Sequence, residues 1–146
     1  MSLHITLGPM YSGKTTRLFE QNTREKNANT KPMVIDYDID DIEYDGNTYR
    51  FGEIKNHDDK TIKNVYKTKG LMNYDLLSEV KNYDAILVNE AQFFHCLDVF
   101  VQYCLEQRKN VYLYGLDGDF ERKPMGQIID LIPICDTVTK LQGICY

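Results

Sequence analysis

The chain has 146 residues, of which 42% are hydrophobic and 27% charged, and its formal net charge is −5 at pH 7. This length is typical of one domain with its own core, so we expect residues 1–146 to form a single domain. The acidic balance argues against non-specific binding to nucleic acid or anionic membranes, and no apolar run reaches the length of a membrane span. The chain opens without a signal-peptide pattern, and we expect a cytoplasmic protein.

The first predicted strand leads directly into a glycine-containing loop. The apolar run Leu3–Leu7 predicts a buried strand, and residues 15–26 predict a helix. The loop between them reads Gly8-Pro9-Met10-Tyr11-Ser12-Gly13-Lys14-Thr15-Thr16, which matches G-x-x-x-x-G-K-[ST]. In such a loop the backbone N–H groups surround phosphates, Lys14 lies beside the β- and γ-phosphates, and the Thr15 hydroxyl binds Mg²⁺. The motif predicts a site for ATP or GTP and leaves the reaction open.

A cluster of acidic residues follows the second predicted strand, Met33–Ile35. Four aspartates lie within residues 36–41, where a strand of an open α/β sheet would reach its carboxyl edge. They can help to hold Mg²⁺ or a ribose hydroxyl, and a solvated acidic loop is an equal alternative. Residues 42–51 alternate β-forming side chains around Asp45-Gly46, which predicts a hairpin. His57 and Asp58 are interpreted as loop or strand-edge residues in preference to a catalytic pair, because no nucleophile accompanies them.

The segment at residues 83–94 carries the second informative pattern. Its apolar run Ala85–Val88 predicts a central parallel strand that ends in polar residues, the layout of a Walker B strand beside a phosphate-binding loop. Glu90 is then the candidate general base. An aspartate ordinarily helps to hold Mg²⁺ at the position of Asn89. An amide oxygen can accept a hydrogen bond from metal-bound water but lacks the charge, so we expect weaker Mg²⁺ binding unless Asp36, Asp38, Asp58 or the nucleotide phosphates compensate.

The rest of the chain continues the alternation of helices and strands. Helices are predicted over residues 74–81, with Asn73 as N-cap, and over residues 97–107. Strands are predicted at Val111–Tyr114 and at residues 137–141. Residues 115–126, rich in glycine and charge, predict a lid. The four cysteines include no C-x-x-C pair, so no complete zinc site is predicted.

Three segments together resemble the type II thymidine kinases of cells and large DNA viruses. They are GPMYSGKTT at residues 8–16, VNEAQFF at 88–94 and LDGDFERKPMG at 116–126, in matching order and spacing. The resemblance implies a RecA-like P-loop NTPase of the α/β class, with an open, mostly parallel sheet and helices on both faces. It further implies ATP and Mg²⁺ as cofactors, transfer of the γ-phosphoryl group to the 5′-hydroxyl of thymidine, and a homo-oligomer, with a tetramer as the family habit.

The same resemblance assigns roles to individual residues. Catalysis is assigned to Lys14 and to Glu90, the base that takes the proton of the 5′-hydroxyl. Residues 8–16 hold the triphosphate, and Mg²⁺ is assigned to Thr15 and, through water, to Asn89. The nucleoside pocket is assigned to Met10, Phe93, Leu116 and Phe120. The lid residues on the phosphate side are Arg122 and Lys123.

The sequence departs from the family pattern at three places. Asn89 replaces the family's aspartate, and the family's arginine is not evident near residues 40–42. The family continues past Cys145 into a C-x-x-C…C-x-x-C zinc ribbon and a lasso loop that grips the thymine, and we expect both to be missing here. A second hypothesis therefore remains beside the kinase: a catalytically impaired nucleotide-binding protein with a lost or changed acceptor site.

Overall fold

A computed structural model describes residues 1–9, 13–40, 42, 44, 46, 48–116 and 127–141. Within this part of the chain the strands are β1 (Ser2–Leu7), β2 (Pro32–Tyr37), β3 (Arg50–Lys55), β4 (Thr61–Thr68), β5 (Ala85–Asn89), β6 (Asn110–Gly115) and β7 (Thr137–Lys140). The α-helices are α1 (Lys14–Asn27), α2 (Tyr74–Val80) and α3 (Leu97–Glu106). Two 3₁₀ helices, η1 (Ala91–Phe93) and η2 (Ile129–Ile134), complete the described elements.

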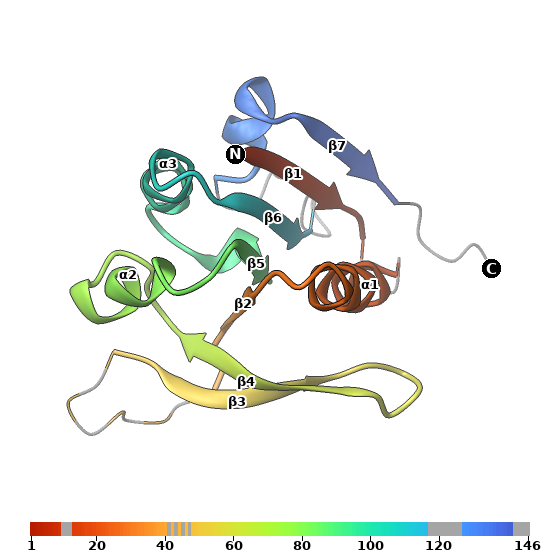
Figure 1. Cartoon of the computed structure of the whole chain (residues 1–146), viewed down its shortest axis with the longest axis vertical. Helices are drawn as coiled ribbons and strands as arrows, with labels where there is room; N and C mark the ends of the chain where they lie inside the picture. The colour runs from red at the N-terminus through yellow and green to blue at the C-terminus, as the bar shows by residue number, and fades with distance from the viewer. Residues whose placement is uncertain are drawn as a thin grey trace.

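The seven strands that the structure describes form one sheet in the order β3-β4-β2-β5-β6-β1-β7 (Figure 1). All neighbouring pairs are parallel except β3 and β4. The α/β class and the mostly parallel sheet expected from the sequence are therefore confirmed. Because β1, β2, β5 and β6 run in the same direction, the residues that follow these strands meet at one edge of the sheet.

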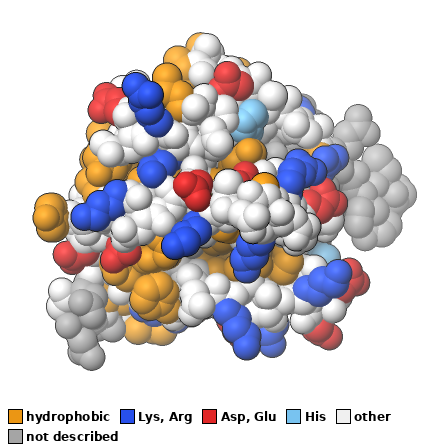
Figure 2. Space-filling view, viewed as in Figure 1, with side chains coloured by type: hydrophobic (Ala, Val, Ile, Leu, Met, Phe, Trp, Pro, Cys, Tyr) orange, Lys and Arg blue, Asp and Glu red, His pale blue; other side chains and the backbone are white. Residues whose placement is uncertain are grey.

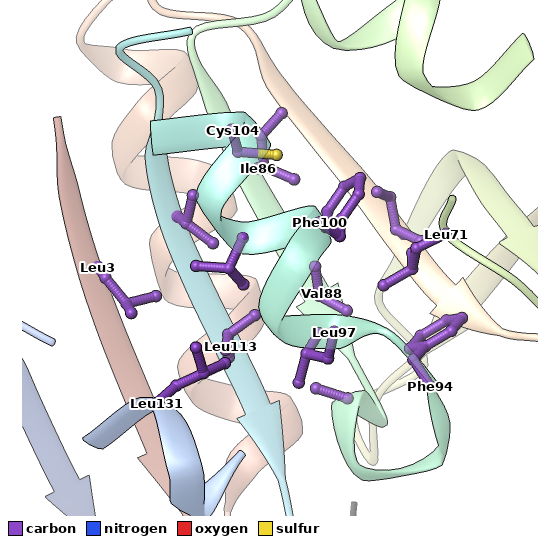
Figure 3. Close-up of a cluster of buried hydrophobic side chains, with 14 of the residues drawn as sticks. Leu3, Leu71, Ile86, Val88, Phe94, Leu97, Phe100, Cys104, Leu113 and Leu131 are labelled. Atoms are coloured by element: carbon purple, nitrogen blue, oxygen red, sulfur yellow. The ribbon is translucent and has the colours of Figure 1, made fainter. Parts of the chain in front are cut away.

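Helices cover both faces of the sheet, with α2 and α3 on one side and α1 on the other (Figure 1). Successive strand residues point to opposite faces. Ile86 and Val88 of β5 therefore belong to the larger core cluster, and Leu87 belongs to the smaller cluster with Leu18 of α1. In the larger cluster, the side chains of α3 point toward β5 and β6 (Figure 3). A strand buried on both faces explains the unbroken apolar run of β5.

The predicted helices are confirmed to within a residue or two at their ends. Helix α1 presents Leu18 to the sheet, fully buried. Helix α2 begins after Asn73, whose side chain accepts a hydrogen bond from the Leu76 N–H at 2.8 Å. The apolar positions of α3 recur at helical spacing, and Leu97, Phe100, Val101 and Cys104 are all fully buried. These elements follow from local sequence signals.

The hairpin predicted around Asp45-Gly46 falls partly outside the described residues, since 41, 43, 45 and 47 are not among them. Strand β3 pairs with β4 in antiparallel orientation, and the chain reverses between Asn56 and Lys60. The Asn56 side chain accepts hydrogen bonds from the backbone N–H groups of Asp58 and Lys60, both at 2.9 Å, so it builds the turn through a polar side chain. His57 and Asp58 accordingly lie in a turn, and residues 61–68 form β4.

The surface drawn in Figure 2 mixes Lys and Arg side chains with Asp and Glu, and no single basic area dominates that face. This distribution is in keeping with the net charge of −5. None of the helices in the described residues is both long and apolar enough to cross a membrane.

Candidate active site

The phosphate-loop residues lie where β1 ends and α1 begins. Gly13 adopts a left-handed backbone with φ of 93°, a conformation that favours glycine, and it is the N-cap of α1. Lys14, the first residue of α1, donates from Nζ to the backbone carbonyls of Gly8 at 3.0 Å and Pro9 at 2.7 Å. The first turn of α1 carries no acidic side chain, so the partial positive charge of the helix end is not offset there. An ammonium beside the N-terminus of a helix is a combination that can attract an anion.

The carboxyl ends of β2 and β5 bring Asp36 beside Asn89, which are partners in the parallel register. The Asn89 amide donates from Nδ2 to Asp36 Oδ1 at 3.0 Å. Lys67 of β4 forms an ion pair with Asp36 Oδ2 at 2.5 Å. Asp36 is buried, and a lysine and an amide engage both of its oxygens. Its negative charge is therefore compensated within the protein.

A second buried carboxylate, Asp38, is held by the edge strand. Arg50 of β3 donates to it from Nε at 2.8 Å and from Nη2 at 2.9 Å, and the Tyr44 hydroxyl donates at 2.6 Å. These hydrogen bonds, led by that of Arg50, hold the pKa of the Asp38 carboxyl well below its usual range, although burial opposes the shift. Arg50 also contacts Asp40 at 2.9 Å. Its own pKa is raised, first by the hydrogen bond to Asp38.

Within the acidic cluster, Asp36 and Asp38 are buried and paired with cations, so these two residues are not part of a solvated loop. Their oxygens face Lys67 and Arg50, so they are not an open set of metal ligands. Asp40 is exposed, and Asp41 lies outside the described residues. Among the described residues, no group of three or more His, Cys, Asp or Glu side chains is placed to hold a metal ion.

A cleft of about 430 Å³ opens at this sheet edge, and Asn89, Glu90 and Phe93 line it together with residues 36–40 and Lys67. Glu90 is half-buried and has a positive φ of 52°, a left-handed backbone that is uncommon outside glycine and is concentrated at functional sites. The Gln92 side chain donates from Nε2 to Glu90 Oε2 at 2.7 Å. A carboxylate held at the mouth of a cleft in this way suits a proton acceptor.

One wall of the cleft is aromatic. Phe93 is 39% exposed, and its ring lies 5.1 Å from the ring of Tyr37 at β2's end. Tyr37 in turn contacts the buried Phe94 edge-on at 5.3 Å. The buried Phe94 therefore supports Tyr37, which in turn lies beside Phe93. A planar, partly apolar ligand would find a stacking surface on Phe93.

The structure places the predicted residues in two groups at the same sheet edge. The phosphate-loop group comprises Gly8, Pro9, Gly13, Lys14, Thr15 and Thr16. The cleft group comprises Asn89, Glu90 and Phe93. Leu116 follows β6 directly, and its N–H donates to Gln92 Oε1 at 3.2 Å. Six predicted residues lie outside the described part of the chain: Met10, Tyr11, Ser12, Phe120, Arg122 and Lys123.

Sequence reasoning missed four residues that build this site. Tyr37 and Gln92 were inside patterns already singled out, at the end of a strand and within VNEAQFF, yet neither was assigned a role. Arg50 and Lys67 carried no local signal, because they reach the acidic residues only through the β3–β4–β2 part of the sheet. Arg50 brings a guanidinium to residues 38–40, where the sequence showed no nearby arginine.

The structure brings a lysine-bearing helix end, a half-buried carboxylate and an aromatic wall to one edge of the sheet, and comparison with known proteins names the family. The thymidine kinase family model matches residues 1–146. The chain is 37% identical, over 149 aligned positions, to the thymidine kinase of Choristoneura fumiferana entomopoxvirus, covering 99% of this chain and 77% of that protein. The identity is 32% with the thymidine kinase of sheeppox virus (strain KS-1), over 98% of this chain and 75% of that protein.

A relative outside the viruses is similar to the same extent. The chain is 34% identical to thymidine kinase 1 of Dictyostelium discoideum, over 98% of this chain and 61% of that protein. The chain therefore belongs to the thymidine kinase family. The resemblance drawn from the three sequence segments is confirmed at the level of the family.

Proposed function

We propose that this protein is an ATP-dependent nucleoside kinase that transfers the γ-phosphoryl group of ATP to the 5′-hydroxyl of thymidine. One observation supports it above all: Glu90 and Phe93 share a cleft at the sheet edge where Lys14 and the start of α1 also lie. A base, a stacking surface and an anion-binding helix end are the groups that such a transfer requires. The relatives are named thymidine kinases, which supports thymidine as the acceptor.

On the phosphate side, we propose a P-loop of the RecA-like class. Residues 8–16 would bind the triphosphate through backbone N–H groups, and the Lys14 ammonium would lie beside its β- and γ-phosphates. Lys14 already faces the loop, since it donates to the carbonyls of Gly8 and Pro9. Arg122 and Lys123 would add positive charge from the lid.

The residues present fit Mg²⁺ only in part. Thr15 and Asn89 offer a hydroxyl and an amide oxygen, which are hard ligands of the kind that Mg²⁺ prefers. Asp36, the carboxylate beside Asn89, is engaged by Lys67. We therefore propose that Thr15 holds the ion together with the nucleotide phosphates, and that Asn89 contacts it through water. The ion would offset charge on the transferring phosphoryl group.

On the acceptor side, Glu90 would take the proton of the 5′-hydroxyl while the oxygen of that hydroxyl bonds to the γ-phosphorus of ATP. The bond from that phosphorus to the bridging oxygen breaks, and ADP leaves. Phe93 would stack on the base, supported by Tyr37. Met10, Leu116 and Phe120 would complete the apolar pocket. Arg50 and Lys67 neutralise the aspartates at this edge and so reduce their repulsion of an incoming phosphate.

The test is transfer of labelled γ-phosphate from ATP with Mg²⁺ to thymidine by the purified chain. Lys14→Ala should abolish both ATP binding and transfer. Glu90→Gln should lower transfer by about 10² to 10⁴-fold, the usual contribution of a general base, and leave ATP binding intact. Glu106→Gln, at an exposed position of α3, is the matched control and should resemble the parent.

Two outcomes would contradict the proposal at different points. Equal transfer by Glu90→Gln and the parent would remove Glu90 from the base role. ATP binding by the parent, with neither transfer nor thymidine binding at millimolar concentration, would favour the alternative of a catalytically impaired nucleotide-binding protein. The amide at position 89, where a carboxylate is ordinary, is the observation on which that alternative rests.

We also propose, from family membership, that the protein forms a homo-oligomer and that the oligomer is a tetramer. Light scattering of the purified chain tests this directly, since the monomer has a mass of 17.1 kDa. A monomer at working concentrations would contradict it.

A further inference from the structure

The Gln92 side chain is buried and bridges two parts of the site. It is 4% exposed, and it donates from Nε2 to Glu90 Oε2 at 2.7 Å. Its other end, Oε1, accepts the backbone N–H of Leu116 at 3.2 Å. The two partners fix the orientation of the amide, because the carboxylate requires a donor and the N–H requires an acceptor. A buried amide with both ends satisfied is held rigidly.

Gly115, the last residue of β6, leaves space for the Gln92 amide because it has no side chain. A Cβ atom on Gly115 would lie 2.7 Å from Gln92 Oε1 and 2.4 Å from Ile128 Cδ1. Real Cβ atoms do not approach other atoms so closely, so any larger residue at this position would displace both side chains. Gly115 thus allows the Gln92 amide to lie against the end of β6.

The same end of β6 contacts the phosphate loop. The Gly115 carbonyl accepts the Gly8 N–H at 3.2 Å, and the Gly8 carbonyl accepts Lys14 Nζ at 3.0 Å. Gln92 therefore links the Glu90 carboxylate to the residue pair 115–116, which is itself bonded to the loop. This series of contacts spans the strands β5, β6 and β1, which are neighbours in the sheet.

We propose that Gln92 is a positioning residue that fixes the Glu90 carboxylate and holds it in register with the phosphate loop through the end of β6. This inference rests on the proposed function, in which Glu90 is the base. The Gln92 amide binds Oε2, so in this proposal Oε1 is the oxygen that takes the proton of the acceptor hydroxyl. Gln92 acts through Glu90 and not on the substrate.

The first test replaces the amide by an apolar side chain of similar length. Gln92→Met should lower kcat for thymidine phosphorylation by about 10 to 100-fold, the usual effect of misplacing a catalytic group by a fraction of an ångström to an ångström. KM for ATP should change by less than about threefold, because the contacts of Gly8 and Lys14 in the phosphate loop do not involve the Gln92 side chain. Gln102→Met, at an exposed glutamine of α3, is the matched control and should match the parent. Parental kcat in Gln92→Met overturns the inference.

A double-mutant comparison separates positioning from a general structural role. In the Glu90→Gln background, Gln92→Met should cause no more than about a twofold further loss, because a residue acting through Glu90 has nothing left to position. A further loss as large as that in the parent background would overturn the proposal. If Glu90→Gln itself retained full activity, the proposed base would fail first, which distinguishes the two failures.

A third test displaces the Gln92 amide without removing it, by adding a Cβ atom at position 115. The background for this test is Ile128→Val, which deletes the Cδ1 atom that such a Cβ would also meet. Ile128→Val alone should retain parental kcat. Adding Gly115→Ala in that background crowds Gln92 Oε1 and should lower kcat about tenfold or more, with ATP affinity by calorimetry unchanged. Unchanged kcat in this double variant would contradict the role assigned to the Gln92 contact.

Discussion

Replacement of Arg50 by methionine tests the ion pair that shapes the wall of the cleft. Arg50 is 29% exposed, and it donates two hydrogen bonds to Asp38, whose side chain is 1% exposed. Arg50→Met keeps most of the aliphatic length and removes the charge. Asp38 then retains the Tyr44 hydroxyl and the Asp40 N–H as donors, without a cation.

The expected cost in the free energy of unfolding at pH 7 is about 3 kcal/mol. Removing one partner of a buried ion pair typically costs about 3–5 kcal/mol, because the other charge stays buried without compensation. The lower end applies because Arg50 is partly exposed and two donors to Asp38 remain. Such a loss is a large share of the total stability of about 5–15 kcal/mol typical of a domain.

The difference should depend on pH in a stated direction. The folded pKa of Asp38 lies below its unfolded value of about 3.9, so the pair stabilises the fold fully above that value. As the pH falls toward the folded pKa, this contribution is lost in the parent, and the part that depends on Arg50 is already absent in Arg50→Met. The gap between the two proteins should therefore begin to shrink below about pH 5 and continue to shrink as the pH falls through 3.

Urea unfolding of the parent, Arg50→Met and Lys55→Met at pH 7, 5 and 3 measures these differences. Lys55 lies on the same strand and is exposed, so Lys55→Met should stay within about 0.5 kcal/mol of the parent. A loss below about 1 kcal/mol in Arg50→Met at pH 7, or a loss that does not change with pH, would refute the reasoning.

Two further predictions concern packing and capping. Phe100→Ala should lower the free energy of unfolding by about 3–5 kcal/mol in urea, because the ring is fully buried between α3 and the sheet (Figure 3), and a loss below about 1 kcal/mol would contradict that placement. Asn73→Ala should cost about 1 kcal/mol, since Oδ1 accepts from the Leu76 N–H and from the Thr48 hydroxyl, both at 2.8 Å. Asn73→Asp should retain most of that stability, and an equal loss in the two variants would argue against the cap.

Local signals in the sequence predicted the helices and the parallel strands well. Helix α3 is an example, because Leu97, Phe100, Val101 and Cys104 recur at helical spacing and all four are buried. Neighbouring residues alone set such a period and such a cap as that of Asn73. The pairing of β3, the strand that contains Arg50, with β4 carried no comparably clear local signal.

Some residues of the candidate site were predicted from local sequence and others were not. Lys14 belongs to the loop motif after β1, and Glu90 directly follows β5, so both are visible in the sequence. Their partners are not visible there. Gln92 meets Leu116 across 24 residues, and Lys67 meets Asp36 across 31. From the sequence alone, the aspartates of residues 36–41 are interpreted as a metal or ribose site or as a solvated loop. Their pairing with Arg50 and Lys67 is not visible there, because these two cations lie on other strands.

The sequence by itself determined the period of each helix, the buried strands and the phosphate-loop motif, because each depends on residues close together in the chain. It also determined the family resemblance, which needs only the order and spacing of three short segments. Only the tertiary structure decided the order of strands, and with it the contacts of Arg50 with Asp38, Lys67 with Asp36, and Gln92 with both Glu90 and Leu116. The physical reason is that strand order follows from burying both faces of the whole sheet at once. No local pattern encodes which strand edges this brings together.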